Sequence, residues 1–199
     1  MTDARTLEVY ARAVDAYDRL TGEAGHSGDL DAFLSALPKG PGPVLDWGAG
    51  PGRDAARMIA AGIDCEAVDA APAMVERARA RGVPARCETF DRLDARSRYR
   101  GIWASFALLH AEAEALPGLI ARAAHALVPG GVLHLGMKRG RRSARDALGR
   151  RYVYVEADDL DTFTRRAGLV VLSLRHGRSR GLDGRPADHL IHLSRRPHA

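Results

Sequence analysis

The sequence contains very little cysteine. Only Cys65 and Cys87 occur among the 199 residues, 22 positions apart and with no other cysteine or histidine at metal-ligand spacing. This usage argues against a disulfide framework and against a zinc site. Both cysteines fall in expected strands, so we expect two inert core thiols in a reducing cytoplasm.

Long apolar runs are also absent. No run approaches the roughly 18 residues that a membrane-spanning helix needs, and the first 20 residues contain acids but no apolar signal-peptide core. There is no internal repeat and no low-complexity tract. We therefore expect a single cytoplasmic domain, residues 1–199, without membrane contact, as a monomer or homodimer.

Positive charge is concentrated in one segment. Residues 138–151 hold seven basic side chains and one acid, a net charge of +6, so the rest of the chain sums to −1 within a total of +5. Three interpretations remain open: a solvated loop or helix, a lid that recognises an acidic small substrate, and a nucleic-acid contact. Arg139, Arg142 and Arg151 are the arginines that the second interpretation would use.

The pattern of apolar residues predicts helices first and then an alternation of strands and helices. Leu7, Tyr10, Val14 and Tyr17 recur at helical spacing, and a second short helix precedes Pro38. We expect residues 1–40 to form a helical cap on a core of residues 41–199. Strands are expected at 44–47, 63–68, 83–89, 101–106, 132–137, 169–174 and 188–193, and helices at 54–61, 72–81, 112–127 and 158–167. Such alternation predicts an α/β fold with a mostly parallel sheet and helices on both faces.

A glycine-rich turn lies between the first strand and the first core helix. Val44 to Trp47 runs directly into Gly48, Gly50 and Gly52, and glycines at such a turn let a nucleotide-like ligand approach the backbone. The second strand ends in an acid, Asp69, 19 residues beyond Gly50. An acid at that distance typically binds the two hydroxyls of a ribose.

Four segments together resemble the class I S-adenosylmethionine (SAM)-dependent methyltransferases of the small bacterial, small-molecule branch. They are VLDWGAGPGRD at 44–54, AVDAAPAMVERAR at 67–79, YRGIWASFALLH at 99–110 and ALVPGGVLHLGMK at 126–138. The resemblance implies a Rossmann-like sheet of seven strands in the order 3-2-1-4-5-7-6, with the seventh strand antiparallel. It also implies SAM as the cofactor, S-adenosylhomocysteine as its product, and no metal.

The resemblance assigns roles to individual residues. The loop after the first strand would hold the methionine part of SAM, Asp69 its ribose, the following residues its adenine, and the end of the fourth strand its sulfonium, while Tyr17, together with Tyr10, would close over it. The cofactor-binding residues so implied are Asp46, Gly48, Ala49, Gly50, Asp69, Ala70, Met74, Phe90, Asp91, Ala104, Ser105 and Tyr17.

Methyl transfer from SAM is an in-line displacement that needs alignment and, for some acceptors, removal of a proton. His110 is the candidate base; the alternative is a histidine at a helix start whose ring is satisfied by backbone groups. Phe106, His110 and Arg139 are the candidate acceptor-binding residues. His134 is expected in the core and His125 on a solvated helix face.

Three other functions are alternatives to methyl transfer onto a small molecule. A dinucleotide-dependent oxidoreductase would prefer glycine at position 53, which is Arg53. An RNA or DNA methyltransferase that uses the basic segment 138–151 is a second alternative. Amino-methylating DNA enzymes carry an Asp/Asn-Pro-Pro-aromatic motif where this chain reads Ser105-Phe106-Ala107-Leu108, so nucleic acid is an unlikely partner. A non-catalytic SAM-binding protein stays open. The sequence therefore predicts methyl transfer from SAM to an O, N or S atom of an unidentified small molecule.

Overall fold

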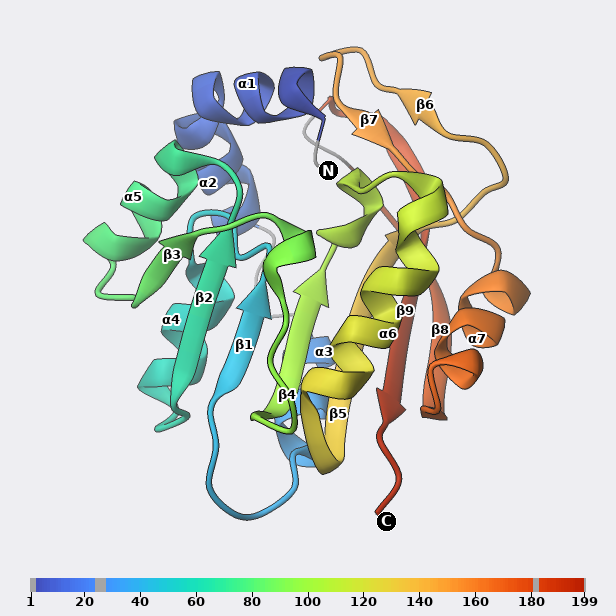
Figure 1. Ribbon diagram of the computed structural model, residues 1–199. Coiled ribbons are helices and arrows are strands. Elements are labelled where there is room, and N and C mark those ends of the chain that lie inside the picture. Colours follow the sequence, from blue (N-terminus) through green and yellow to red (C-terminus); the bar gives the residue numbers. More distant parts are fainter. Residues whose placement is uncertain (1–2, 24–27, 181–182, 199) are drawn as a thin grey trace.

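A seven-stranded sheet forms the centre of the computed structural model, which describes residues 3–23, 28–180 and 183–198 (Figure 1). The strand order is β3-β2-β1-β4-β5-β9-β8; β3 to β5 are parallel, and β9 is antiparallel to both β5 and β8. The predicted order is confirmed, because β8 and β9 are the expected sixth and seventh strands. The sheet strands are β1 Val44–Trp47, β2 Cys65–Asp69, β3 Ala85–Cys87, β4 Tyr99–Ser105, β5 Leu127–Lys138, β8 Val170–Arg180 and β9 Pro186–Arg195.

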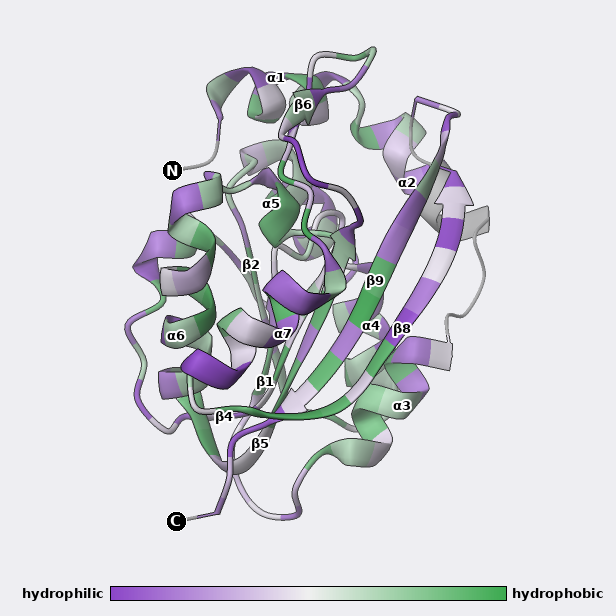
Figure 2. Ribbon diagram, turned by 90° about the vertical axis from the view of Figure 1, so that its right-hand side faces the viewer, coloured by the Kyte–Doolittle hydropathy of each residue, from purple (hydrophilic) through white to green (hydrophobic). Residues whose placement is uncertain are grey.

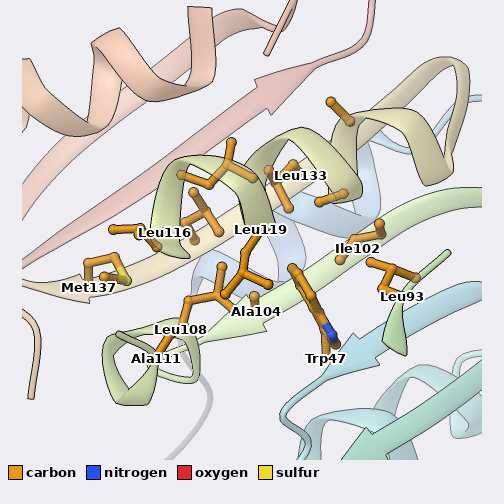
Figure 3. Packing of buried hydrophobic residues seen from close by; sticks show 14 of the residues in the cluster. Trp47, Leu93, Ile102, Ala104, Leu108, Ala111, Leu116, Leu119, Leu133 and Met137 are labelled. Atoms are coloured by element: carbon orange, nitrogen blue, oxygen red, sulfur yellow. The ribbon is translucent and has the colours of Figure 1, made fainter. Parts of the chain in front are cut away.

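Helices cover both faces of this sheet, as predicted. On one face pack α3 (Gly28–Ala36), α4 (Arg53–Ala60) and α5 (Pro72–Ala80), with Phe33 against Trp103. On the other face pack α6 (Leu116–Ala126) and α7 (Ala157–Arg166), and the apolar side of α6 meets Trp47 and Ile102 (Figure 3). All four residues of β1 are buried, as expected for a strand with a core on each side.

The turn from β1 into α4 requires glycine. Gly52 caps α4 with φ 76°, in the left-handed region, and a Cβ there would lie 2.7 Å from the Cβ of Ala78 on α5. A side chain at this position would therefore be strained and would also push α4 and α5 apart.

The expected first helix is two helices. α1 (Ala4–Arg12) begins at Asp3, whose side chain accepts a hydrogen bond from the Thr6 N–H, and ends at Ala13, where φ is −108° and ψ is 14°. α2 (Val14–Glu23) then continues in a new direction. Both lie beyond the arrowheads of the parallel strands (Figure 1), whereas α3 packs on a face of the sheet.

The C-terminal half departs furthest from the sequence prediction. β8 and β9 extend well past 169–174 and 188–193 because they pair with each other as far as Arg180 and Pro186. Their outer halves are largely hydrophilic (Figure 2), so apolar periodicity could not predict them. The basic segment contains an unpredicted ribbon, β6 (Ala144–Arg145) paired with β7 (Arg151–Tyr152).

Two further boundaries differ. The expected helix 112–127 starts later, at Leu116, because 3-10 turns occupy Leu108–His110 and Ala113–Ala115. β5 begins at Leu127, which pairs with Tyr99 across an irregularity in the ladder.

The two cysteines are free but differ in exposure. Cys65 is buried in the core, whereas Cys87 is exposed at the end of the edge strand β3. The prediction of two core thiols is therefore wrong for Cys87: only Ala85 of this three-residue strand faces the core. Within the described ranges, no helix is long and apolar enough to cross a membrane and no cluster of His, Cys, Asp or Glu has the makings of a metal site.

Candidate active site

A cavity of about 60 Å³ lies at the carboxyl ends of β1, β2 and β4, beneath α1 and α2. This is where ligands bind in open parallel sheets. Ten of the residues expected to bind cofactor or acceptor line it: Tyr17, Gly48, Gly50, Asp69, Ala70, Met74, Phe90, Ser105, Phe106 and His110. Tyr10 lines it too, as do Thr6, Leu7 and Ala107, which the sequence analysis missed. Thr6 and Leu7 precede Tyr10 by four and three residues, so the helical periodicity that placed Tyr10 and Tyr17 contained the signal for them.

Five expected residues lie outside the cavity lining. Asp46 is buried and accepts a hydrogen bond from the Ala55 N–H at 3.1 Å, so it ties α4 to β1. Burial, followed by the charge of Asp54, raises its pKa well above the usual range. Ala104 belongs to the core, Asp91 is exposed, and Ala49 packs on the cluster beneath α4. Arg139 forms an ion pair with Glu156 at 2.9 Å.

Asp69 joins the end of β2 to the glycine turn. Its Oδ2 accepts from the Gly50 N–H and its Oδ1 accepts from the Ala71 N–H, both at 2.8 Å. Burial raises its pKa, and these backbone hydrogen bonds oppose the rise. A carboxylate offers about four lone-pair sites, so Asp69 retains acceptor capacity for two hydroxyl groups of a ligand.

Helices α1 and α2 close the cavity. Tyr17 lies against the glycine turn, since a Cβ on Gly50 would be 3.5 Å from its ring. Asp18, 5% exposed, bonds Arg53 at 2.7 Å, Arg81 at 2.5 Å and Arg77 at 3.3 Å. Sites for drug-sized ligands typically measure roughly 300–1,000 Å³. The cavity is therefore smaller than a nucleoside-sized ligand requires.

The other end of α1 is held by the ribbon. Thr6 Oγ1 accepts a hydrogen bond from the Arg151 N–H at 2.9 Å, and Asp3 pairs with Arg145 at 2.7 Å. Each of these contacts joins residues more than 140 positions apart. The ribbon is therefore part of the wall that positions α1.

His110 is buried and engaged at both ring nitrogens. Its Nδ1 lies 2.9 Å from the Arg151 carbonyl oxygen and its Nε2 lies 2.8 Å from the Tyr10 hydroxyl. Burial lowers the pKa of His110 to about 4, so the ring is neutral near pH 7. A carbonyl only accepts, which places the single ring proton on Nδ1 and makes Nε2 the acceptor of the Tyr10 O–H. The backbone carbonyl of Arg151 satisfies one ring nitrogen, as expected for a histidine held by backbone groups. The Tyr10 side chain satisfies the other.

Four of the seven basic side chains of the segment form ion pairs with acids, whereas Arg142 is exposed. Arg139 pairs with Glu156, Arg145 with Asp3, Arg150 with Asp146 and Arg151 with Glu112. Lys138 lies over the ring of Tyr152, 3.7 Å from its centroid. Neither Arg139 nor Arg151 is thus available as an uncompensated cation for an acidic substrate, and the solvated-segment interpretation gains support.

The two further histidines discussed in the sequence analysis, His134 and His125, lie as predicted. His134 is buried, stacked on Trp103 with ring centroids 3.7 Å apart, and His125 is exposed on α6.

The sequence and the fold were compared with those of known proteins. The family model described as "Methyltransferase domain" matches residues 44–131, from β1 into β5. A search of curated proteins found no match.

Solved structures share the fold. The Burkholderia thailandensis 1,6-didemethyltoxoflavin-N1-methyltransferase, bound to 1,6-didemethyltoxoflavin and S-adenosylhomocysteine, is 24% identical over 98% of this chain and 88% of its own, with a TM-score of 0.77. The CcbJ methyltransferase from Streptomyces caelestis is 20% identical over 93% of this chain and 95% of its own, with a TM-score of 0.69. A cyclase, SpnF, also matches, at 20% identity over 85% of this chain and 80% of its own and a TM-score of 0.68. Because the fold carries more than one activity, the function must be argued from the site.

Proposed function

Since residues 44–131 match a methyltransferase domain model, we propose that the chain is a class I SAM-dependent methyltransferase that transfers a methyl group from SAM to an O, N or S atom of a small-molecule acceptor. One observation carries the proposal. The ribose-type acid Asp69 and the glycine turn are hydrogen bonded to each other, and they share one enclosed cavity with Ser105, Phe106 and His110.

The donor set of the cavity fits SAM. In the proposal Asp69 accepts from the ribose hydroxyls, while Gly48 and Gly50 present backbone to the methionine part. The apolar side chains of Ala70, Met74 and Phe90 line the cavity where the adenine would lie, beside Asp69. Ser105 and Phe106 sit at the end of β4, where the sulfonium would lie, and His110 is the proton acceptor. Asp46 supports the glycine turn from below by holding α4.

Bound SAM supplies a methyl carbon already activated by positive sulfur. The chain's own work is to align the acceptor about 3–3.5 Å from that carbon, to exclude water and to hold a proton. The buried cavity under α1 and α2 serves the first two tasks.

The enclosed site favours a small molecule over a nucleic acid. A polymer acceptor would need an open, cationic groove, but four arginines of the basic segment are paired with acids. The alternative of a non-catalytic SAM-binding protein shares the same pocket and differs only in turnover.

Calorimetry with SAM and S-adenosylhomocysteine tests binding. Two charge-assisted hydrogen bonds contribute about 1.5–3 kcal/mol each, so Asp69→Asn and Asp69→Ala should weaken SAM binding by at least about 100-fold. Asp64→Ala, at the exposed opposite end of β2, is the matched control and should bind SAM normally. Failure of the unmodified protein to bind either compound would reject the proposal.

Turnover needs a separate assay. Metabolite fractions incubated with methyl-labelled SAM should yield a labelled small molecule. Retention of all label in SAM, with SAM binding intact, would favour the non-catalytic alternative.

A further inference from the structure

Tyr10, His110 and Arg150 form one buried hydrogen-bonded chain beside the cavity. The Tyr10 hydroxyl lies 2.8 Å from His110 Nε2 and 3.1 Å from Nη1 of Arg150. Arg150 is 2% exposed and bonds the Asp146 carboxylate through both Nε, at 2.9 Å, and Nη2, at 2.6 Å. The three residues come from α1, from the turn after β4 and from the loop before β7, so only the tertiary fold assembles them.

The direction of each hydrogen bond follows from the donors. Arg150 can only donate, so the Tyr10 oxygen accepts from it. His110 Nε2 carries no proton, so the Tyr10 hydroxyl donates to it. Both ring nitrogens of His110 are thus engaged, and His110 does not face the cavity with a free acceptor atom. The Tyr10 oxygen directs its own proton to His110 and accepts from Arg150 and from Tyr152, so an acceptor group reaches it by displacing the Tyr152 hydroxyl.

We propose that Tyr10 is the catalytic residue that takes the acceptor's proton, that it passes its own proton to His110, and that Arg150 positions it. The inference rests on the proposed function. It also defines the acceptor group, which must carry a hydrogen as a neutral O–H or N–H. Besides Phe90 and Tyr17, which the proposed function assigns to the cofactor, the cavity walls include the rings of Tyr10, Phe106 and His110, which favours a planar aromatic or heteroaromatic acceptor.

The step balances in atoms and charge. The acceptor atom bonds to the methyl carbon as the carbon–sulfur bond breaks, and that electron pair goes to sulfur. The acceptor's proton moves to the Tyr10 oxygen, and the Tyr10 proton moves to His110 Nε2. One positive charge disappears at sulfur as another appears on the imidazole, so the net charge of the buried site is constant and no extra charge needs to be desolvated.

The surrounding groups favour proton release from Tyr10 and disfavour a lasting charge on His110. The guanidinium of Arg150 favours negative charge on the Tyr10 oxygen and opposes the rise that burial causes in the pKa of Tyr10; a hydrogen bond from Tyr152 acts in the same direction. Burial disfavours the imidazolium of His110 most strongly, and the charges of Arg150 and Lys138 add to this, whereas the Arg151 carbonyl and Asp146 favour it. The imidazolium is therefore short-lived and returns its proton once product leaves.

Kinetics of conservative variants test the assignment. The acceptors are 4-nitrophenol, indole and 1,6-didemethyltoxoflavin, each with methyl-labelled SAM. Tyr10→Phe and His110→Gln should each lower kcat by about 100- to 10,000-fold, the usual contribution of a positioned proton acceptor, with the SAM Kd within tenfold. The double variant should be no slower than either single variant, because the two side chains act as one unit. Tyr154→Phe, the same change at a half-buried tyrosine outside the cavity lining, should leave kcat unchanged.

Three results would overturn the inference: a Tyr10→Phe kcat within threefold of the unmodified protein, additive losses in the double variant, or intact SAM binding with none of the three acceptors methylated. A merely structural role for Tyr10 would lower the melting temperature and SAM affinity and leave the pH profile of kcat unmoved. Absence of SAM binding is a different outcome, since it rejects the proposed function itself.

Discussion

Asp18 is the contact whose loss should most change how the site opens. Its buried carboxylate holds α2 to Arg53 of α4 and to Arg77 and Arg81 at α5. Asp18→Asn removes the charge and keeps the shape. Because the arginines are 25–38% exposed, water screens part of the effect, and we take about 2 kcal/mol, below the 3–5 kcal/mol typical of breaking a fully buried pair.

That loss should appear as kinetics more than as affinity. The cavity of about 60 Å³ is smaller than SAM requires. If α2 must move aside to admit SAM, the association rate scales with the open population. A 2 kcal/mol loss raises that population about 30-fold. If the ion pairs of Asp18 also hold α2 over bound SAM, the dissociation rate rises by the same factor and Kd changes only a few-fold.

Stopped-flow fluorescence measures both rates. Trp47 stacks edge-on against the cavity residue Phe90, with ring centroids 5.5 Å apart, and should report ligand arrival. Asp15→Asn is the matched control, because Asp15 lies on the same helix, is 70% exposed and forms an ion pair with Arg77. Unchanged rates in Asp18→Asn would show that α2 does not gate the site. An equal acceleration in Asp15→Asn would show that surface charge, and not the Asp18 ion pairs, controls the rates.

Two further predictions concern stability. Gly52→Ala should lower the free energy of unfolding in urea by about 2 kcal/mol or more, because φ is 76° and the new Cβ would lie 2.7 Å from that of Ala78; Gly62→Ala, with φ 78° and nothing within 4 Å, should lose only the backbone part, and equal losses would contradict the packing argument. Burial lowers the pKa of His134 to about 3, so the unfolded state, with a pKa near 6.5, binds the extra proton and stability falls as pH drops below about 6.5. Between pH 7.5 and pH 5, His134→Phe should therefore lose about 2 kcal/mol less than the unmodified protein, and parallel pH dependences for the two proteins would refute the assignment.

The central fold was predictable because its information is local. The residues from Val44 to Gly52 predict a buried strand followed by a turn that requires glycine. Asp69 ends the next strand, beside the end of β1 in the sheet. Where apolar periodicity is weak, prediction failed. The outer halves of β8 and β9 are polar, and the ribbon β6–β7 is two residues per strand, so only pairing between segments defines them.

The site was predictable to the extent that it follows the strands. Residues just after β1, β2 and β4 reach the cavity because parallel strands end at one edge of the sheet. Arg139 was expected there from its charge alone, and it pairs with Glu156 instead, since a distant acid competes for it. Thr6 and Leu7 precede Tyr10 by about one helical turn and could have been named with it. That this face of α1 lies over the cavity depends on the break at Ala13 and was not predictable.

By itself the sequence determined the glycine turn and the acid that faces it, because each depends on neighbours along the chain or on a shared strand end. The sheet order was implied only by the resemblance to a known family. The tertiary structure decided the chemistry at the cavity wall. Tyr10 and His110 lie 100 positions apart, and whether the histidine is free or already bonded depends on how α1, the ribbon and the turn after β4 meet. Contacts of that range depend on packing, and no local pattern of residues records them.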